Sequence, residues 1–110
     1  MSLYANYLTE KTDDQILETE KGFATYRYLE DESAVYIVDI YVLPEFRKSG
    51  EAAAMADAIA TEAKERGVKR LVGSVVPSNK GSTDSLRVLL AYGFKLDSSS
   101  NNFLLFKKEL

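Results

Sequence analysis

Hydrophobic and polar positions divide the 110-residue chain into strand-like and helix-like segments. The strongest strand pattern covers residues 34–43, AVYIVDIYVL, which are rich in β-branched and aromatic side chains. This segment is apolar on both faces, so we expect a central strand that is covered on both sides. Pro44 ends it, because proline cannot donate to a sheet ladder.

Shorter patterns precede this strand. Residues 16–19 and 23–29 flank Glu20-Lys21-Gly22, which indicates a hairpin because glycine adopts the positive φ of tight turns. The composition of residues 3–8 allows a short strand, and that of residues 31–33 predicts a second turn.

From Ala52 to Arg66 the hydrophobic period becomes helical, and Gly67 follows as a natural stop. One stripe of this helix carries Ala52, Met55, Ala56, Ile59 and Ala63. Residues 70–76, RLVGSVV, then predict a second buried strand.

A second helix is predicted over residues 83–92, with Ser82 or Thr83 as its cap and Gly93 as its terminator. Residues 94–96 and 103–107 predict a closing hairpin across the polar loop 97–102. The strand–helix–strand crossover, set within a mostly antiparallel mixed sheet, predicts a three-layer α/β/α domain of the α+β class. We expect one domain over residues 1–110.

Composition narrows the chemistry. The chain has no cysteine and no histidine, which excludes thiolate nucleophiles, serine–histidine triads and nearly all metal sites with nitrogen or sulfur ligands. The net charge of −3 argues against nucleic acid. No apolar run is long enough to span a bilayer and no secretory signal is visible, so we expect a cytoplasmic protein that binds no membrane and no metal.

A turn with basic residues separates the central strand from the long helix. In Arg47-Lys48-Ser49-Gly50-Glu51-Ala52 a glycine and small residues let an anion approach the unpaired backbone N–H groups of the helix start. Arg47 and Lys48 add positive charge at the rim. These residues suggest a phosphate or pyrophosphate site, and they are also compatible with a plain strand-to-helix connection.

The same residues resemble a known family. Arg47 to Ala52 matches the pyrophosphate motif of the GNAT superfamily of acyl-CoA-dependent N-acyltransferases, [Gln/Arg]-x-x-Gly-x-[Gly/Ala]. The lead-in IYVLPEF, the run ERGVKRL after the helix, and Pro77-Ser78-Asn79 followed by Tyr92-Gly93-Phe94 are similar to the family as well. The resemblance covers about residues 16–110.

The resemblance implies a splayed central strand with the pantetheine arm of acetyl-CoA, the cosubstrate, lying in the gap. Backbone groups of Tyr41, Val42 and Leu43 would bind that arm. Those around Arg47, Lys48, Ser49, Gly50, Glu51 and Ala52 would bind the pyrophosphate, and Asn79 matches a position that often contacts the cofactor. The reaction would be attack of an amine on the thioester carbonyl.

Two side chains are candidates for proton transfer. Asp39 is the one charged residue of the central strand, and burial beside apolar neighbours would raise its pKa toward a value useful for a base. A carboxylate that serves as a structural hydrogen-bond acceptor, or one that lies where the strand frays toward solvent, is equally compatible with this position. In the family a tyrosine four residues before the glycine of Gly-Phe often protonates the thiolate; here that position is Leu89, and Tyr92 is the nearby alternative.

Other departures concern the phosphate turn and the N-terminal segment. Glu51 replaces an aliphatic residue inside the turn, and we expect it to point sideways. About fifteen residues precede the first confident strand, where relatives have room for two helices, so the chain resembles a minimal family member. Either a short loop or a partner subunit would complete the acceptor site, and we expect a homodimer. The sequence supports an N-acetyltransferase acting on a small-molecule or protein amine; the alternatives are an acyl-CoA-binding or scaffold module without turnover, and a ferredoxin-like interaction domain.

Overall fold

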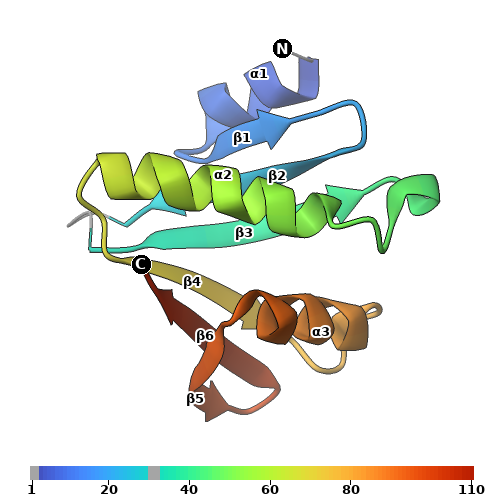
Figure 1. Cartoon of the computed structure of the whole chain (residues 1–110), viewed down its shortest axis with the longest axis vertical. Coiled ribbons are helices and arrows are strands. Elements are labelled where there is room, and N and C mark those ends of the chain that lie inside the picture. Colours follow the sequence, from blue (N-terminus) through green and yellow to red (C-terminus); the bar gives the residue numbers. More distant parts are fainter. Residues whose placement is uncertain (1–2, 30–32) are drawn as a thin grey trace.

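The computed structural model describes residues 3–29 and 33–110, and the predicted turn at 31–33 therefore lies mostly outside the described residues. Within them a six-stranded mixed sheet has the order β1-β2-β3-β4-β6-β5 (Figure 1). The strands are β1 (Gln15–Glu18), β2 (Gly22–Tyr28), β3 (Val35–Val42), β4 (Arg70–Val75), β5 (Lys95–Ser100) and β6 (Phe103–Glu109). All neighbours pair antiparallel except β3 and β4, which run parallel.

Three α-helices accompany this sheet in the described residues: α1 (Leu3–Lys11), α2 (Glu51–Glu65) and α3 (Ser82–Tyr92). A 3₁₀ turn, η1 (Pro44–Phe46), leads from β3 toward α2. Figure 1 shows α2 and α3 side by side over one face of the sheet. The α+β class with one strand–helix–strand crossover and a closing hairpin is thus confirmed.

Helix α1 lies on the opposite face, where the Tyr4 ring meets the Phe23 ring at 5.9 Å. Phe23 is next to Ala24, which is packed in the core under α2, and successive strand residues point to opposite faces. The prediction of a strand at residues 3–8 is wrong. The helix buries only Ala5 while Tyr4 and Tyr7 stay about half exposed, so its sequence carries no helical stripe.

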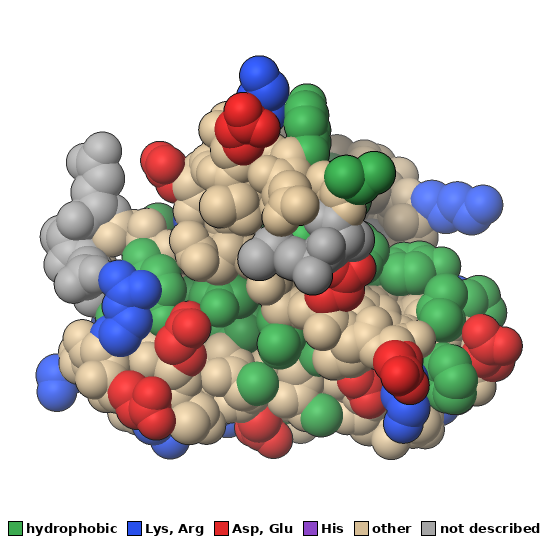
Figure 2. All heavy atoms as spheres, turned by 90° about the horizontal axis from the view of Figure 1, so that it is seen from above, with side chains coloured by type: hydrophobic (Ala, Val, Ile, Leu, Met, Phe, Trp, Pro, Cys, Tyr) green, Lys and Arg blue, Asp and Glu red, His purple; other side chains and the backbone are tan. Residues whose placement is uncertain are grey.

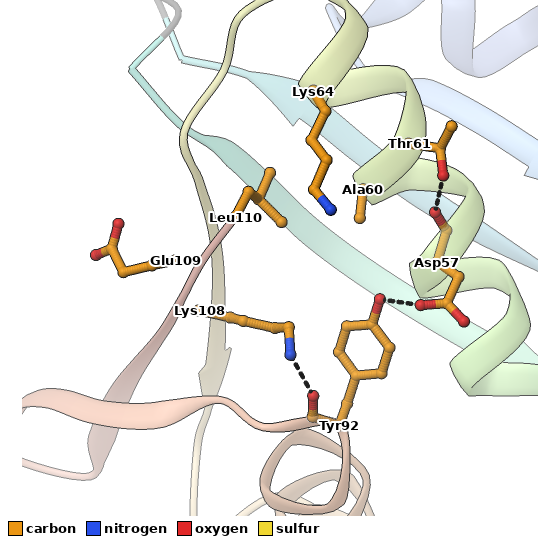
Figure 3. Close-up of a pocket in the computed structure, with 8 residues that line it drawn as sticks. All are labelled: Asp57, Ala60, Thr61, Lys64, Tyr92, Lys108, Glu109 and Leu110. Atoms are coloured by element: carbon orange, nitrogen blue, oxygen red, sulfur yellow. Dashed lines mark hydrogen bonds between the residues drawn. The ribbon is translucent and has the colours of Figure 1, made fainter.

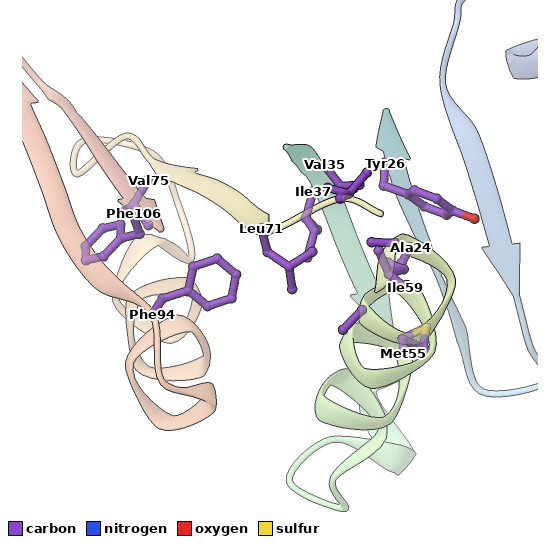
Figure 4. Close-up of a cluster of buried hydrophobic side chains, with 13 residues drawn as sticks. Ala24, Tyr26, Val35, Ile37, Met55, Ile59, Leu71, Val75, Phe94 and Phe106 are labelled. Carbon is purple, nitrogen blue, oxygen red and sulfur yellow. The ribbon is translucent and has the colours of Figure 1, made fainter. Parts of the chain in front are cut away.

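One hydrophobic core fills the space between the sheet and the helices α2 and α3 (Figure 4). Met55 and Ile59 of α2 and Leu71 of β4 are essentially fully buried in it, and Phe94 and Phe106 extend it under α3. The predicted stripe of α2 is confirmed in Met55, Ala56, Ile59 and Ala63.

Three further expectations need correction. The strand at β3 is central, but its second face is not covered, since Val38, Asp39 and Tyr41 are exposed. The predicted loop 97–102 is shorter in the structure: β5 continues to Ser100 because it pairs with β6, although all of its residues are exposed, and only residues 101–102 form the turn. Helix α3 follows Gly81 at φ +82 rather than a serine or threonine cap. Gly93, at φ +103, ends that helix as predicted.

Candidate functional site

Strands β3 and β4 part soon after they meet. Their parallel ladder contains only Val35 with Leu71 and Tyr36 with Val72. Strand β2, in contrast, pairs with β3 along its length, from Tyr28 with Val35 to Gly22 with Val42. The edge of β3 that faces β4 therefore carries no ladder partners beyond Tyr36, and the strands open a V toward their carboxyl ends. The splay implied by the family resemblance is present.

The backbone of residues 41–43 divides its polar groups between β2 and this gap. The Leu43 N–H donates to the Lys21 carbonyl at 2.8 Å, and the Tyr41 carbonyl lies against Gly22, where an added Cβ would be 2.0 Å away. Because backbone groups alternate along a strand, those of Val42 face the gap. Of the three residues expected to bind a pantetheine arm, Val42 presents its N–H there, whereas the Leu43 N–H is engaged.

The turn after β3 is shaped by two left-handed residues, Lys48 at φ +64 and Gly50 at φ +87. Gly50 is the N-cap of α2, and the first intrahelical bond runs from the Ala54 N–H to its carbonyl at 2.9 Å. The N–H groups of residues 51–53 precede that bond and point outward from the helix start. Nothing lies within 4 Å of the position of a Gly50 Cβ. The turn therefore presents a group of accessible backbone donors, of the kind that binds anions.

Side chains around this turn leave the donors accessible. Arg47 folds back on β3, where its Nε donates to the Val42 carbonyl at 2.9 Å and its guanidinium lies 5.6 Å from the centre of the Tyr41 ring. The Glu51 carboxylate accepts a bond from the Thr19 hydroxyl at 3.2 Å, so it points toward the β1–β2 turn, sideways as expected. Lys48 and Ser49 are exposed.

Asp39 is exposed, and the expectation of a buried carboxylate is wrong. Its place follows from a bulge in β3. Thr25 pairs with Asp39, and Tyr26 pairs with Ile37, so Val38 is the extra residue. The bulge puts Asp39 on the sheet face opposite α2, where its own side chain is exposed although its neighbour Thr25 is buried.

Tyr92 lies away from the gap. Its hydroxyl donates to the Asp57 carboxylate of α2, and the Lys108 ammonium donates to its carbonyl at 2.8 Å (Figure 3). Burial, followed by the bond to Asp57, raises the pKa of the Tyr92 hydroxyl. Lys108 pairs with Leu71, at the closed end of the β3–β4 pair. Tyr92, Asp57 and Lys108 line a hollow of about 450 Å³. The structure therefore does not bring Tyr92 together with Asp39.

Leu89 and Asn79 take positions nearer the gap. The Leu89 side chain is 3.1 Å from the position of a Gly73 Cβ on β4, so an apolar group occupies the place of the family's usual acid. Asn79 is exposed in the turn after β4, where its N–H donates to the Val76 carbonyl at 2.9 Å. Carboxyl ends of parallel strands meet at one edge of a sheet, so Asn79 lies at the same edge as the phosphate turn.

Sequence reasoning missed Tyr36 and Ser74. Their hydroxyl oxygens are 2.5 Å apart and bridge β3 to β4 where the strands part. Neither residue belongs to a motif, and their proximity depends on the pairing of distant strands, so no signal in the sequence marks them.

The described part of the chain contains neither a metal-binding cluster nor a membrane-spanning helix. No group of three acidic, histidine or cysteine side chains there is arranged to hold a metal ion. Residues 3–29 and 33–110 also contain no helix long and apolar enough to cross a membrane. Figure 2 views the molecule from the β1 edge and shows cations and carboxylates interspersed on that face.

Comparison with known proteins identifies the family. The model of the acetyltransferase (GNAT) family matches residues 11–90, and the chain belongs to this family, whose members use acetyl-CoA as cosubstrate. No curated protein shows a significant match to the chain.

Solved structures share the fold at low identity. A putative GNAT acetyltransferase from Desulfovibrio desulfuricans superposes with a TM-score of 0.78 at 14% identity, over 94% of this chain and 75% of that one. PaiA N-acetyltransferase from Thermoplasma acidophilum, in complex with coenzyme A, superposes with a TM-score of 0.76 at 13% identity, over 96% of this chain and 66% of that one. A GNAT acetyltransferase from Elizabethkingia anophelis with acetyl-CoA bound superposes with a TM-score of 0.72 at 20% identity, over 98% of this chain and 82% of that one. The chain thus spans two-thirds to four-fifths of the length of these proteins.

Proposed function

We propose that the chain transfers an acetyl group from acetyl-CoA to an amine of a small molecule or protein by direct attack. The observation that carries this proposal is the V between β3 and β4, which is paired at two positions only and leads directly into the turn of backbone donors at residues 47–52. A polyanion at the turn and an extended arm in the V fit these two features together.

The residues of the turn and of β3 have separate roles in this proposal. The N–H groups of residues 51–53 hold the pyrophosphate at the positive end of the α2 dipole, with Arg47 and Lys48 adding charge at the rim. The Val42 N–H binds the pantetheine arm in the gap, and Asn79 approaches it from the loop after β4. Tyr41 takes part through its ring, which packs against the Arg47 guanidinium, and not through its own backbone groups.

Asp39 is proposed as the base that takes the proton from the attacking ammonium. Because the Asp39 side chain is exposed, an acceptor amine can reach the carboxylate directly. Tyr92 has no role in this proposal, because its hydroxyl is engaged with Asp57 at the closed end of the strand pair.

The proposal is tested by thiol release from acetyl-CoA against tyramine, spermidine and a peptide with a free N-terminal alanine. Wild type is expected to release thiol with at least one of them. Asp39→Asn is expected to keep acetyl-CoA affinity and to lower kcat by about 10²-fold or more. Asp13→Asn, which changes an exposed acid in the α1–β1 connection, is the matched control and should leave kcat unchanged. An unaffected rate in Asp39→Asn would remove Asp39 from the mechanism.

A second candidate function is a module that binds acyl-CoA without turnover. Leu89 favours it, because an apolar side chain stands where the family often has its acid. Calorimetric binding of acetyl-CoA without thiol release for any amine would support this module over the enzyme.

A homodimer remains part of the proposal. Strands β1 and β5 are the sheet edges among the described residues, and β5 is exposed along its whole length. Sedimentation at equilibrium distinguishes a dimer from the 12.3 kDa monomer.

A further inference from the structure

Two hydroxyl groups meet across the β3–β4 gap. The Tyr36 Oη and the Ser74 Oγ lie 2.5 Å apart, and both side chains are half-buried. Tyr36 belongs to the last residue pair that joins the two strands, and Ser74 comes two residues after its partner Val72. The bridge therefore spans the V at its narrow end.

The bulge at Val38 aligns this bridge with Asp39. Tyr36 pairs with Arg27 and Asp39 pairs with Thr25, and these two β2 residues share the face opposite α2. Without the extra residue, positions 36 and 39 would point to opposite faces. With it, the Asp39 carboxylate and the Tyr36 phenol share one face of the sheet beside the gap.

The proposed function sets the direction in which a cosubstrate would enter. With the phosphates at residues 47–52, at the wide end of the V, the arm extends along β3 toward its narrow end. From Val42 to Tyr36 the strand rises by about 20 Å, at roughly 3.3 Å per residue. The thioester end therefore lies toward the hydroxyl pair, whereas Leu89 contributes no proton on the α3 side.

We propose that the Tyr36 hydroxyl is the proton donor to the departing sulfur, and that Ser74 positions it; this inference rests on the proposed function. When the Ser74 hydroxyl donates to the Tyr36 oxygen, the Tyr36 proton is free to point toward the gap. The amine nitrogen, after losing a proton to Asp39, bonds to the acetyl carbon. It releases a second proton to solvent as the carbon–sulfur bond breaks, and Asp39 returns its own proton to solvent. The sulfur takes the Tyr36 proton, and the phenolate regains one from solvent through Ser74.

The kinetic test compares two variants that break the same hydrogen bond. Tyr36→Phe keeps the ring and removes the donor, so kcat should fall by about 10²-fold or more while the KM for acetyl-CoA changes little. Ser74→Ala leaves the Tyr36 hydroxyl in place, and kcat should fall by less than about tenfold. The matched control is Tyr28→Phe, which removes the bond from Tyr28 to Glu62 at 2.6 Å on the other face. Rates are measured with whichever of tyramine, spermidine and the alanine peptide is fastest.

Binding supplies a readout that needs no turnover. Calorimetry with coenzyme A and with desulfo-coenzyme A, which lacks the sulfur, isolates the contact with Tyr36. Tyr36→Phe should weaken binding of coenzyme A by about two- to tenfold, as for one lost hydrogen bond, and leave that of desulfo-coenzyme A unchanged. Tyr28→Phe should alter neither affinity.

The outcomes separate this inference from the proposed function. If Tyr36→Phe and Ser74→Ala lose equal activity, the bridge is structural and the inference is overturned, while acetyl transfer stands. The same holds if Tyr36→Phe binds coenzyme A and desulfo-coenzyme A more weakly to the same extent. If wild type acetylates none of the three amines, the proposed function fails and the role of Tyr36 fails with it.

Discussion

The two ends of the β3–β4 pair use the same strands for opposite purposes. At the closed end Val35 and Leu71 pair, have no exposed surface, and pack with α2 and α3 into the core. At the open end Val42 has no β4 partner, Tyr41 is 40% exposed, and a turn of unpaired donors follows. A strand pair that is secured at one end can stay parted at the other, which leaves backbone groups for a ligand.

The largest change in stability should come from the closed end. Leu71→Ala removes a fully buried side chain from between the helices and should lower the free energy of unfolding by about 2–5 kcal/mol. Urea unfolding measures the loss. Leu90→Ala, at a site that is 52% exposed on α3, is the control and should cost less than about 0.5 kcal/mol. Equal losses for the two variants would show that the core is not where we place it.

A smaller, pH-dependent effect is expected from Tyr28, which pairs with Val35 at the closed end. Burial, and then the bond to Glu62, raise the pKa of Tyr28 to about 12, against about 10 in the unfolded chain. The raised pKa gives stability that is complete below pH 10 and is lost as the pH rises through 12. Wild type should therefore exceed Tyr28→Phe in stability at pH 8, and this difference should shrink by pH 11.5. A difference that is constant with pH would contradict the shift.

The smallest effect concerns Glu51 at the open end. Its carboxylate favours the positive end of the α2 dipole, so Glu51→Gln should cost about 0.3–1 kcal/mol of stability. The same change removes a negative charge beside the donors and should tighten acetyl-CoA binding by about two- to threefold. Calorimetry at constant salt checks the second effect. Weaker binding by the variant would mean that Glu51 helps to shape the turn.

The sequence predicted the closed end better than the open one. Burial leaves a pattern, so the central strand and the α2 stripe could be inferred. The stop at Gly93 could be inferred because glycine adopts the positive φ that ends a helix. The extension of strand β5 over residues 97–100 was not predicted, because pairing with β6 holds these residues in place without burial. Helix α1 was not predicted, because Ala5 is its only buried residue and leaves no helical pattern of apolar positions.

Within the candidate site, local motifs identified the turn at residues 47–52, but long-range geometry stayed hidden. The bulge at Val38 and the Tyr36–Ser74 bridge arise from pairing with β2 and β4, which single-strand patterns do not encode. The exposure of Asp39 could not be inferred either, because the apolar neighbours of residue 39 suggested a covered strand.

The most direct test of the account is calorimetric titration of acetyl-CoA into wild type and Gly50→Val. Gly50 at φ +87 shapes the donor turn, and a β-branched residue there is strained by about 1–3 kcal/mol and obstructs the backbone. Gly67→Val is the matched control, because Gly67 has φ +80, equal free space, and a place at the other end of α2. We predict that wild type and Gly67→Val bind acetyl-CoA alike and that Gly50→Val binds about tenfold more weakly or worse. Equal affinity in all three proteins, or no binding by wild type, would contradict a cosubstrate site at the open end.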